Sequence, residues 1–474
     1  MIGDLIVTIT LLVALSVVTL AAAILLVIKF GHPDDKNEAL WPKTVVILSL
    51  YLAAAAVFVF PLDVSATADP RLRSVMSIIW YAIFASVALL LLLVVPISIS
   101  VYEDADGHAS KSKFVSVLFG LFPLFLIGIL SACLYPFFSS YTLSAQDAEK
   151  VTGSFDAATK TTIDFLLFAV AVLSMIGWAA FALFVPIGLV VLPMDLINAF
   201  VTRPKPMTVS DYGREKVQIG RKATQLLSLA KDEQQSRDQN GFRKSKLSRA
   251  ERKAQVALEI ETYELKKRQA YLEEAYALRG GNPLWYFFQL ILGIVLMLIT
   301  ASWIVHTTIF VLFGVSTGLN SVLSGLQSFP VGSIVYFAVH ALYLLAAAVK
   351  GAFRFSLGSR QLSIYPMEIG NTLMNAFLVN IWLILALVFP LIQFCAISFK
   401  EYASRTVIDG IALRINNLPL FKSFVFFDNI YIYVMGGIMF LTLLMTLACP
   451  RNTTHQLRNR LRNRIELRSD IELR

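Results

Sequence analysis

Apolar residues occur along this chain in runs long enough to cross a lipid bilayer, and polar residues concentrate in the connections between them. A membrane-spanning helix needs about 20 mostly apolar residues. The runs that meet this length are residues 5–28, 44–62, 75–101, 114–138, 163–192, 284–313, 331–349, 371–399 and 424–449. The pattern therefore predicts an all-α, polytopic integral membrane protein with about nine transmembrane helices.

One long polar stretch, residues 195–283, interrupts this pattern after the fifth run. Prolines at its entry and a Gly-Gly-Asn-Pro sequence at its exit mark the points where new elements begin. The chain is predicted to comprise a five-span bundle, a helical hairpin, a four-span bundle and a basic tail. Their predicted bounds are 1–194, 195–283, 284–449 and 450–474.

Within the polar stretch, apolar residues recur at helical spacing and predict two helices, near 208–235 and 246–279. The residues that step by seven are Tyr212, Ile219 and Leu226 in the first helix and Leu258, Leu265 and Leu272 in the second. We expect an antiparallel pair. Its coiled-coil seam is thin, because Glu261 and Arg268 occupy positions where a strong seam carries apolar residues. Such a hairpin needs a partner or the membrane surface for full order.

Composition agrees with a membrane protein, since 57% of residues are hydrophobic and 15% are charged. The net charge of +9 arises mainly from the segments that lie on one predicted side of the membrane. If the N-terminus is outside, the cytoplasmic segments hold 33 of the 41 lysines and arginines. This distribution favours an N-out, C-in topology with a cytoplasmic hairpin. No zinc-finger or RNA-binding motif accompanies the basic residues, so we do not expect nucleic-acid binding.

The C-terminal tail combines arginines with apolar residues four positions apart. Its basic residues are Arg458, Arg460, Arg462, Arg464 and Arg468. A basic amphipathic helix beside a membrane span binds anionic lipid headgroups, so membrane lipids are predicted partners. A disordered basic tail that only fixes the topology is an equally good interpretation.

Convincing catalytic motifs are missing from the sequence. It contains no Walker A loop, no G-x-G-x-x-G opening a helix and no H-E-x-x-H. Residues 314–318 match G-x-S-x-G, but they follow a membrane span rather than a strand, so we interpret these glycines as a helix end. The three cysteines lie in apolar runs without metal-ligand spacing. We therefore predict a protein that is not an enzyme and has no metal site and no cofactor.

Polar side chains within the predicted spans are costly in hydrocarbon and usually face protein or water. They are His306, His340, Asn371, Asn375, Asn380 and Gln393. One interpretation is a polar cleft that makes the protein a transporter or channel, with a path through spans seven and eight. The alternative, which we favour, is a set of interhelical hydrogen bonds that hold the bundle together. An intramembrane enzyme that pairs His340 with an asparagine of span eight is a weaker third hypothesis.

Short motifs recur at the ends of three predicted spans. They are Pro61-Leu62-Asp63-Val64, then Tyr102-Glu103-Asp104, then Leu192-Pro193-Met194-Asp195-Leu196-Ile197. Physically, prolines at such positions end helices, and acidic residues there are hydrated at the interface. The ordered motifs, with five spans before a charged insert and four after it, resemble the limb-region membrane-protein family. This family includes the lipocalin-interacting membrane receptor and the lysosomal cobalamin transport escort protein.

The resemblance implies a nine-span protein of lysosomal, endosomal or plasma membranes. It also implies two kinds of role: escort of an ABC transporter in cobalamin export, or endocytic uptake of a ligand. We therefore expect a non-enzymatic membrane receptor or transport-escort protein, whose hairpin and tail recruit a membrane-protein partner. The transporter or channel remains the alternative.

Overall fold

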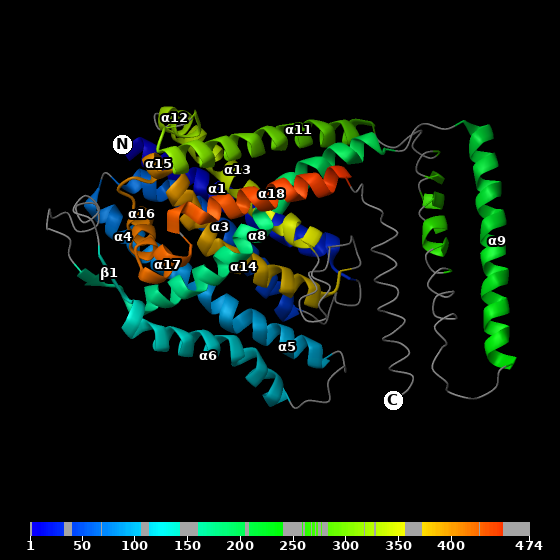
Figure 1. Cartoon of the computed structure of the whole chain (residues 1–474), viewed down its shortest axis with the longest axis horizontal. Coiled ribbons are helices and arrows are strands. Elements are labelled where there is room, and N and C mark those ends of the chain that lie inside the picture. The colour runs from blue at the N-terminus through cyan, green and yellow to red at the C-terminus, as the bar shows by residue number, and fades with distance from the viewer. Residues whose placement is uncertain are drawn as a thin grey trace. The chain divides into compact units, whose positions relative to one another are not determined.

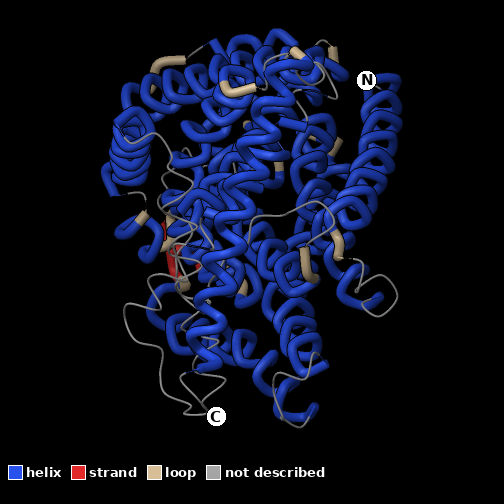
Figure 2. The backbone as a smooth tube through the Cα atoms, turned by 90° about the vertical axis from the view of Figure 1, so that its right-hand side faces the viewer, coloured by secondary structure: helices blue, strands red, loops and turns tan. Residues whose placement is uncertain are grey.

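A computed structural model describes most of the chain outside its C-terminal tail (Figure 1). The described residues are 2–32, 40–67, 69–105, 113–142, 160–203, 208–239, single helical residues and short runs between 258 and 276, 283–316, 318–326, 329–355, 372–425 and 427–448. Figure 2 shows that helices form almost all of this part.

Nine helical segments in the described part are long and apolar enough to span a membrane, which confirms the predicted fold class. They are α1 (Ile2–Phe30), α3 (Leu40–Ala66), α4 (Pro70–Leu89) with η1 (Leu90–Val94) and α5 (Val95–Ala105), α6 (Lys113–Phe138), α8 (Phe165–Val201), α11 (Pro283–His306) with η2 (Thr307–Leu312), α13 (Pro330–Phe355), α14 (Met374–Ser398) and α18 (Ile430–Ala448).

The chain forms two compact units. The first, unit 1, consists of Met1–Leu192 and Leu296–Thr442, and the second, unit 2, consists of Pro193–Val295 and Leu443–Arg474. Most of the membrane-spanning length lies in unit 1. The central polar stretch lies in unit 2 and is considered separately below.

Within unit 1, α14 is the central helix. In its most apolar stretch 72% of residues are buried inside the protein, against 11% for α6. Buried residues lie all around α14 rather than on one face, as expected of a helix surrounded by other helices. Outward-facing residues of α6 are also apolar, for example Phe122 and Ile129. Apolar residues on the outside as well as the inside are typical of helices that face lipid.

Two spans contain a turn of π-helix, η1 and η2. A π-turn changes the backbone hydrogen-bond pattern within the helix and often marks a functional site. In η1 the carbonyl of Leu91 accepts a hydrogen bond of 2.8 Å from the indole N–H of Trp382 on α14. This contact gives the Trp382 N–H an acceptor in an otherwise apolar region.

Two predicted helix ends are wrong. The sequence suggests that helices stop at Pro61 and Pro193, but α3 continues through Pro61 to Ala66 and α8 continues through Pro193 to Val201. Proline removes a single hydrogen bond, and within a membrane neighbouring groups can satisfy the freed carbonyl. By contrast, Gly314 does follow a helix end: it adopts a φ of +67° just after η2. This agrees with interpreting the G-x-S-x-G match as a helix end.

Short elements gather at one end of the unit 1 bundle, on the left in Figure 1. They are the helices α12 (Gly318–Gly325), α15 (Lys400–Ala403), α16 (Val407–Asn416) and α17 (Pro419–Phe424) and the strands β1 (Ser140–Thr142) and β2 (Lys160–Thr162). The strands pair antiparallel, with Tyr141 opposite Thr161. The sequence analysis did not predict this hairpin, because two runs of three residues are too short for a period-two pattern.

In unit 2, α9 (Val209–Gln239) lies beside the helical residues described between 258 and 276. The rings of Tyr212 and Tyr276 stack with centroids 4.0 Å apart, and Arg268 forms a salt bridge of 2.7 Å with Glu215. These contacts confirm a helical hairpin whose two helical segments run antiparallel. Arg268 was predicted to weaken the contact between the two helices, but its salt bridge with Glu215 links them.

The predicted seam positions are less exposed than their neighbours on both helices. Ile219 and Leu272 are buried, and Tyr212, Leu226, Leu258 and Leu265 are half-buried. The seven-residue spacing therefore identified the contact face of the hairpin correctly.

Candidate functional site

Asp63 lies near the end of α3 and is only 1% exposed. Its carboxylate accepts hydrogen bonds from the indole N–H of Trp80 at 2.9 Å and from the backbone N–H groups of Val407 and Ile408 at 3.1 and 2.9 Å. The last two donors form the first turn of α16, where the helix dipole favours a negative charge. Asp63 thus joins α3, α4 and α16.

The expectation that Asp63 is hydrated at the membrane interface is wrong. The connection after α14 supplies two backbone donors to its carboxylate, and Trp80 of α4 supplies the third. Nearby, Tyr402 packs against Phe60 and Phe337, and burial raises the pKa of Tyr402 to about 12, so this phenol stays neutral. The arrangement holds the bundle together and leaves no oxygen of Asp63 facing an open path.

Gln393 is the centre of a second buried network at the same end of the bundle. Its side-chain oxygen accepts hydrogen bonds from Ser174 at 2.8 Å and Trp178 at 2.7 Å, both on α8, and its amide N–H donates to Asn416 on α16. Both sides of the amide are therefore bound. This matches the interpretation of Gln393 as an interhelical hydrogen-bonding residue.

His306 and His340 both pack against the indole ring of Trp303. The ring centroids of His306 and His340 are 5.9 and 6.1 Å from that of Trp303. Nε2 of His306 is 2.8 Å from the carbonyl oxygen of Ser398, and Nδ1 of His340 is 2.8 Å from that of Tyr336. The structure thus brings the two predicted histidines to one aromatic cluster, and each uses a ring nitrogen to bind a backbone carbonyl.

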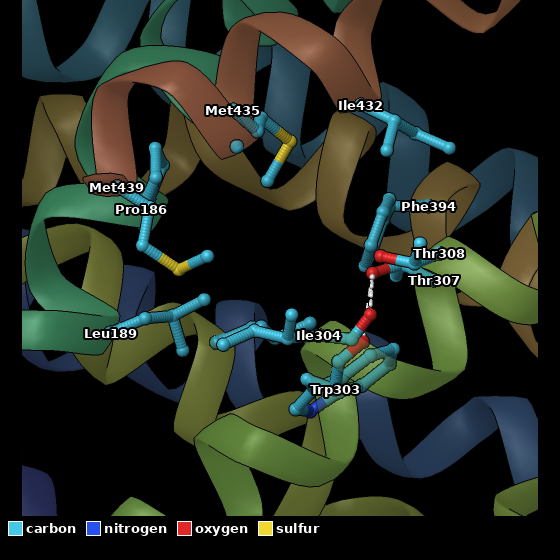
Figure 3. A pocket seen from close by; sticks show the side chains of 12 residues that line it. Pro186, Leu189, Trp303, Ile304, Thr307, Thr308, Phe394, Ile432, Met435 and Met439 are labelled. Carbon is cyan, nitrogen blue, oxygen red and sulfur yellow. Dashed lines mark hydrogen bonds between the residues drawn. The ribbon is translucent and has the colours of Figure 1, made fainter. Parts of the chain in front are cut away.

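Beside this cluster, unit 1 contains an apolar pocket with a volume of ≈ 80 Å³ (Figure 3). Its walls come from five spans: Pro186 and Leu189 of α8, Trp303 to Thr308 of α11 and η2, Leu344 of α13, Phe394 of α14, and Ile432 to Met439 of α18. In Figure 3 the side chains of Met435 and Met439 face Ile304 and Trp303 across the hollow. Methionine adapts its shape easily, so this wall fits an apolar group rather than one fixed shape.

Polar groups at the pocket are few. The hydroxyl of Thr307 donates a hydrogen bond of 2.8 Å to the backbone carbonyl of Trp303, which is drawn as a dashed line in Figure 3. Thr308 adds a second hydroxyl on the same wall. A lining of this kind binds hydrocarbon and excludes water, and it offers no nucleophile paired with a base. No group of three or more metal-ligating side chains occurs in the described part of the chain.

The helices α8 and α13, which both contribute to the pocket wall, cross closely. A Cβ added at Gly188 would lie 1.7 Å from the carbonyl oxygen of Ala347, and one added at Gly351 would lie 1.9 Å from that of Phe184. Glycine at both positions lets the two backbones touch. Thr300 of α11 joins the crossing through a hydrogen bond of 3.1 Å to the carbonyl of Leu189.

The other predicted residues lie elsewhere. Asn380 is buried and lines a different hollow from the one lined by His340, and Asn375 is half-buried at the start of α14. The six predicted cleft residues are thus spread over several environments. Asn371 and the arginines Arg458, Arg460, Arg462, Arg464 and Arg468 lie outside the described residues.

The motif residues also differ in their surroundings. Pro61 is buried within α3, Tyr102 is half-buried at the end of the third span, and Glu103 and Asp104 follow it in α5. In unit 2, Asp195 is half-buried on α8, two residues after Pro193.

Sequence reasoning missed the tryptophans that complete these sites. Trp80 binds Asp63, Trp178 binds Gln393, and Trp303 contacts both histidines. For Trp80 and Trp178 a signal was present, because a tryptophan in an apolar span carries an N–H group that usually finds an acceptor when buried. The acceptor cannot be identified without the fold.

The sequence of this chain is similar to those of known membrane proteins. A family model described as LMBR1-like membrane protein matches residues 6–283, more than half of the chain. The chain is 30% identical to a LIMR family protein of Oryza sativa subsp. japonica, over 82% of this chain and 86% of that protein. It is 28% identical to a LIMR family protein of Dictyostelium discoideum, over 91% of this chain and 95% of that protein.

A LIMR family protein of Arabidopsis thaliana is also 28% identical, over 83% of this chain and 86% of that protein. No solved structure matches the chain. The nine apolar spans, the ordered span-end motifs and these similarities agree. The chain is a multi-pass integral membrane protein that belongs to the LMBR1-like (LIMR) family.

Proposed function

We propose that this chain is a non-enzymatic membrane receptor or transport-escort protein, which recruits a membrane-protein partner through the helical hairpin of unit 2. The observation that carries the proposal is a second apolar face on α9. Val209, Val217 and Leu227 are 72%, 54% and 58% exposed, although the seam of the hairpin is already filled by other residues. Exposed apolar side chains that share one side of a mainly polar helix are typical of a binding surface.

These residues share one side of the helix. At 100° per residue, Val209, Gly213, Val217, Gly220 and Leu227 fall within an arc of about 80°, centred about 120° from Ile219 of the seam. Among the residues that the structure describes, nothing lies within 4 Å of a Cβ added at Gly213 or Gly220. Small residues between larger apolar ones let a partner helix approach closely.

The contacts of buried polar residues support a receptor or escort over an enzyme. Asp63, Gln393 and the two histidines bind fixed groups of the protein itself. On this proposal the partner is an ABC transporter, the protein assists cobalamin export or takes up a ligand by endocytosis, and its membrane is lysosomal, endosomal or plasma membrane. The N-terminus is outside or luminal, and the hairpin and tail are cytoplasmic.

The proposal is tested by affinity purification of tagged full-length protein from gently solubilised membranes, read by quantitative mass spectrometry. Val217→Glu with Leu227→Glu places two charges on the open face of α9. We expect recovery of an ABC transporter to fall about tenfold, because each buried charge costs more than 1 kcal/mol at an apolar interface.

The matched control is Gln218→Glu with Gln225→Glu, which adds the same charge to the other exposed side of α9. It is expected to leave recovery unchanged. Equal recovery from the two double variants would contradict the proposed surface. Repeated purification of the wild-type chain without an ABC transporter would contradict the escort function.

A transporter or channel in its own right is the second candidate function. It is favoured by two hollows along α13, of ≈ 470 Å³ beside His340 and ≈ 400 Å³ beside Asn380. A solute path would have to join them. This function predicts solute flux in liposomes of the purified protein that falls on His340→Ala, and absence of flux with folded protein would contradict it.

A further inference from the structure

The second apolar face of α9 has the spacing of a helix that pairs with another helix. Six of its positions, all of them exposed, follow one another in alternate steps of four and three residues. They are Gly213, Val217, Gly220, Thr224, Leu227 and Lys231. These positions extend over about 27 Å at 1.5 Å per residue. A partner of matching length is therefore a helix of about five turns.

Basic side chains border this face. Arg214 and Arg221, both exposed and seven residues apart, lie on one side of it, at about 100° and 80° from its centre. Lys216 borders the other side. Within residues 213–231 the only acidic residue is Glu215, which lies about 160° from the centre of the face. The charge along both borders of the face therefore has a single sign.

The two arginines are not neutralised within the described part of the chain. No ion pair or hydrogen bond joins the side chain of Arg214 or Arg221 to another described residue. The seam of the hairpin differs, because Glu215 there binds Arg268 at 2.7 Å. Charges that border a helix pair select a partner of opposite charge. A surface that complements this face therefore carries acidic residues.

Charge disfavours two occupants that the chain itself would supply. A second copy, bound through the same face, would place Arg214 and Arg221 against the same arginines. The C-terminal tail, residues 451–474, contains seven arginines and three acidic residues. It would also bring an excess of positive charge to the face. The occupant is thus expected to come from another molecule.

The composition of the face favours a helix over a lipid surface. Helices that lie on a membrane insert large apolar side chains such as those of Trp, Phe and Leu. Here Gly213, Gly220 and Thr224 interrupt the face, so Val217 and Leu227 are its large apolar residues between positions 213 and 231. Side chains of a partner helix would fill the gaps at the two glycines, as knobs fit into holes.

We propose that this face binds an acidic amphipathic helix of a partner protein. The apolar residues of that helix, three and four positions apart, pack along Val217 and Leu227, and its Asp and Glu residues pair with Arg214 and Arg221. This inference rests on the proposed function, because it names the kind of segment through which the recruited partner is bound. It applies whether or not that partner is an ABC transporter.

The first test places the photo-crosslinking residue benzoylphenylalanine at Thr224 of the tagged full-length protein. Membranes are irradiated, and cross-linked peptides are identified by mass spectrometry. The expected adduct is a protein segment with a net negative charge and apolar residues three and four positions apart. The same crosslinker at Lys222, an exposed position on the opposite side of α9, is the control and should not give this adduct.

The other outcomes of this test contradict the proposal. Adducts to lipid, to a second copy or to a segment without net negative charge would overturn it, as would the absence of any adduct. An acidic helical segment from a protein other than an ABC transporter would support the proposal and contradict the escort function. The two conclusions can therefore fail separately.

The second test measures the affinity of two designed peptides for the full-length protein in phosphatidylcholine nanodiscs, by fluorescence anisotropy. Both peptides carry leucines in alternate steps of three and four residues. The bordering residues are glutamates in one peptide and lysines in the other. Wild-type protein should bind the glutamate peptide about tenfold more tightly. Arg214→Glu with Arg221→Glu should reverse this preference.

The matched control for the charge reversal is Lys222→Glu with Lys266→Glu. It changes the charge by the same amount at exposed positions on the opposite side of α9 and on the second helix of the hairpin. This variant should keep the preference for the glutamate peptide. Equal preferences in the two double variants would overturn the proposal, because Arg214 and Arg221 would then not select the bound helix.

Discussion

At the end of the unit 1 bundle that carries α16, Asp63 and Gln393 each bind groups from two other helices, whereas at the opposite end Lys350 and Asn380 line an open hollow. Both ends therefore place polar side chains at membrane depth. At the first end, groups on other helices donate hydrogen bonds to these side chains and accept hydrogen bonds from them. At the second end, they border a hollow with a volume of ≈ 400 Å³. The surroundings of a polar residue, rather than its presence in a span, indicate how strongly the fold depends on it.

The largest effect is expected at Asp63. Asp63→Ala leaves the N–H groups of Trp80, Val407 and Ile408 buried without an acceptor, and we expect it to lower the free energy of unfolding by about 3–5 kcal/mol. Denaturant unfolding of the full-length protein in detergent, followed by tryptophan fluorescence, measures this change. Asp69→Ala, at the half-buried N-cap of α4, is the control and should cost about 1 kcal/mol. Similar losses in the two variants would place Asp63 at a hydrated surface after all.

The close crossing of α8 and α13 should be the next most sensitive point. Gly188→Ala places a methyl group against the carbonyl of Ala347 and should cost about 1–3 kcal/mol, because the two helices must separate. Gly128→Ala is the matched control on α6, where nothing lies within 4 Å of the added Cβ. It should instead stabilise the helix by about 0.5–1 kcal/mol. A stabilising Gly188→Ala would show that the backbones are not in contact.

A similar loss is expected at Gln393. Gln393→Leu keeps the size of the side chain but removes the acceptor of Ser174 and Trp178, which should cost about 1–3 kcal/mol. The same unfolding experiment measures it. Gln393→Glu retains an acceptor for both donors but loses the N–H that binds Asn416, and this comparison separates the two sides of the network. No loss in the leucine variant would contradict a structural role for this amide.

The smallest effect on stability is expected at the opposite end. Lys350→Gln should change the free energy of unfolding by less than about 1 kcal/mol in detergent, because Lys350 is half-buried at the edge of a hollow and glutamine can still donate hydrogen bonds there. The measurement is again denaturant unfolding. A loss as large as that of Asp63→Ala would show that Lys350 supports the fold and would remove the difference between the two ends.

Hydrophobic patterning predicted the fold well where each helix forms from its own sequence. The nine spans follow from run length, and the seam of the hairpin follows from the spacing of Tyr212, Ile219 and Leu226. The helix ends predicted at Pro61 and Pro193 were wrong, because the rule that proline ends a helix is derived for proteins in water. A membrane bundle tolerates proline within a span.

The candidate sites depend on long-range contacts, which local patterns do not contain. Asp63 was noted in its motif, but its partner Ile408 is 345 residues away in the chain. The predicted cleft grouped residues by their position in neighbouring spans, yet His340 and Asn380 line different hollows. Which side of each helix faces which neighbour is decided by close contacts such as that between Gly188 and Ala347.

The difference between the two ends is tested most directly by one measurement, the thermal unfolding midpoint of the full-length protein in detergent. Three proteins are compared: the wild type, Asp63→Ala and Lys350→Gln. We predict that Asp63→Ala unfolds at a clearly lower temperature than the wild type, because three buried N–H groups lose their acceptor. Lys350→Gln should unfold close to the wild type. Equal midpoints for the two variants would contradict the account, as would an unchanged midpoint for Asp63→Ala.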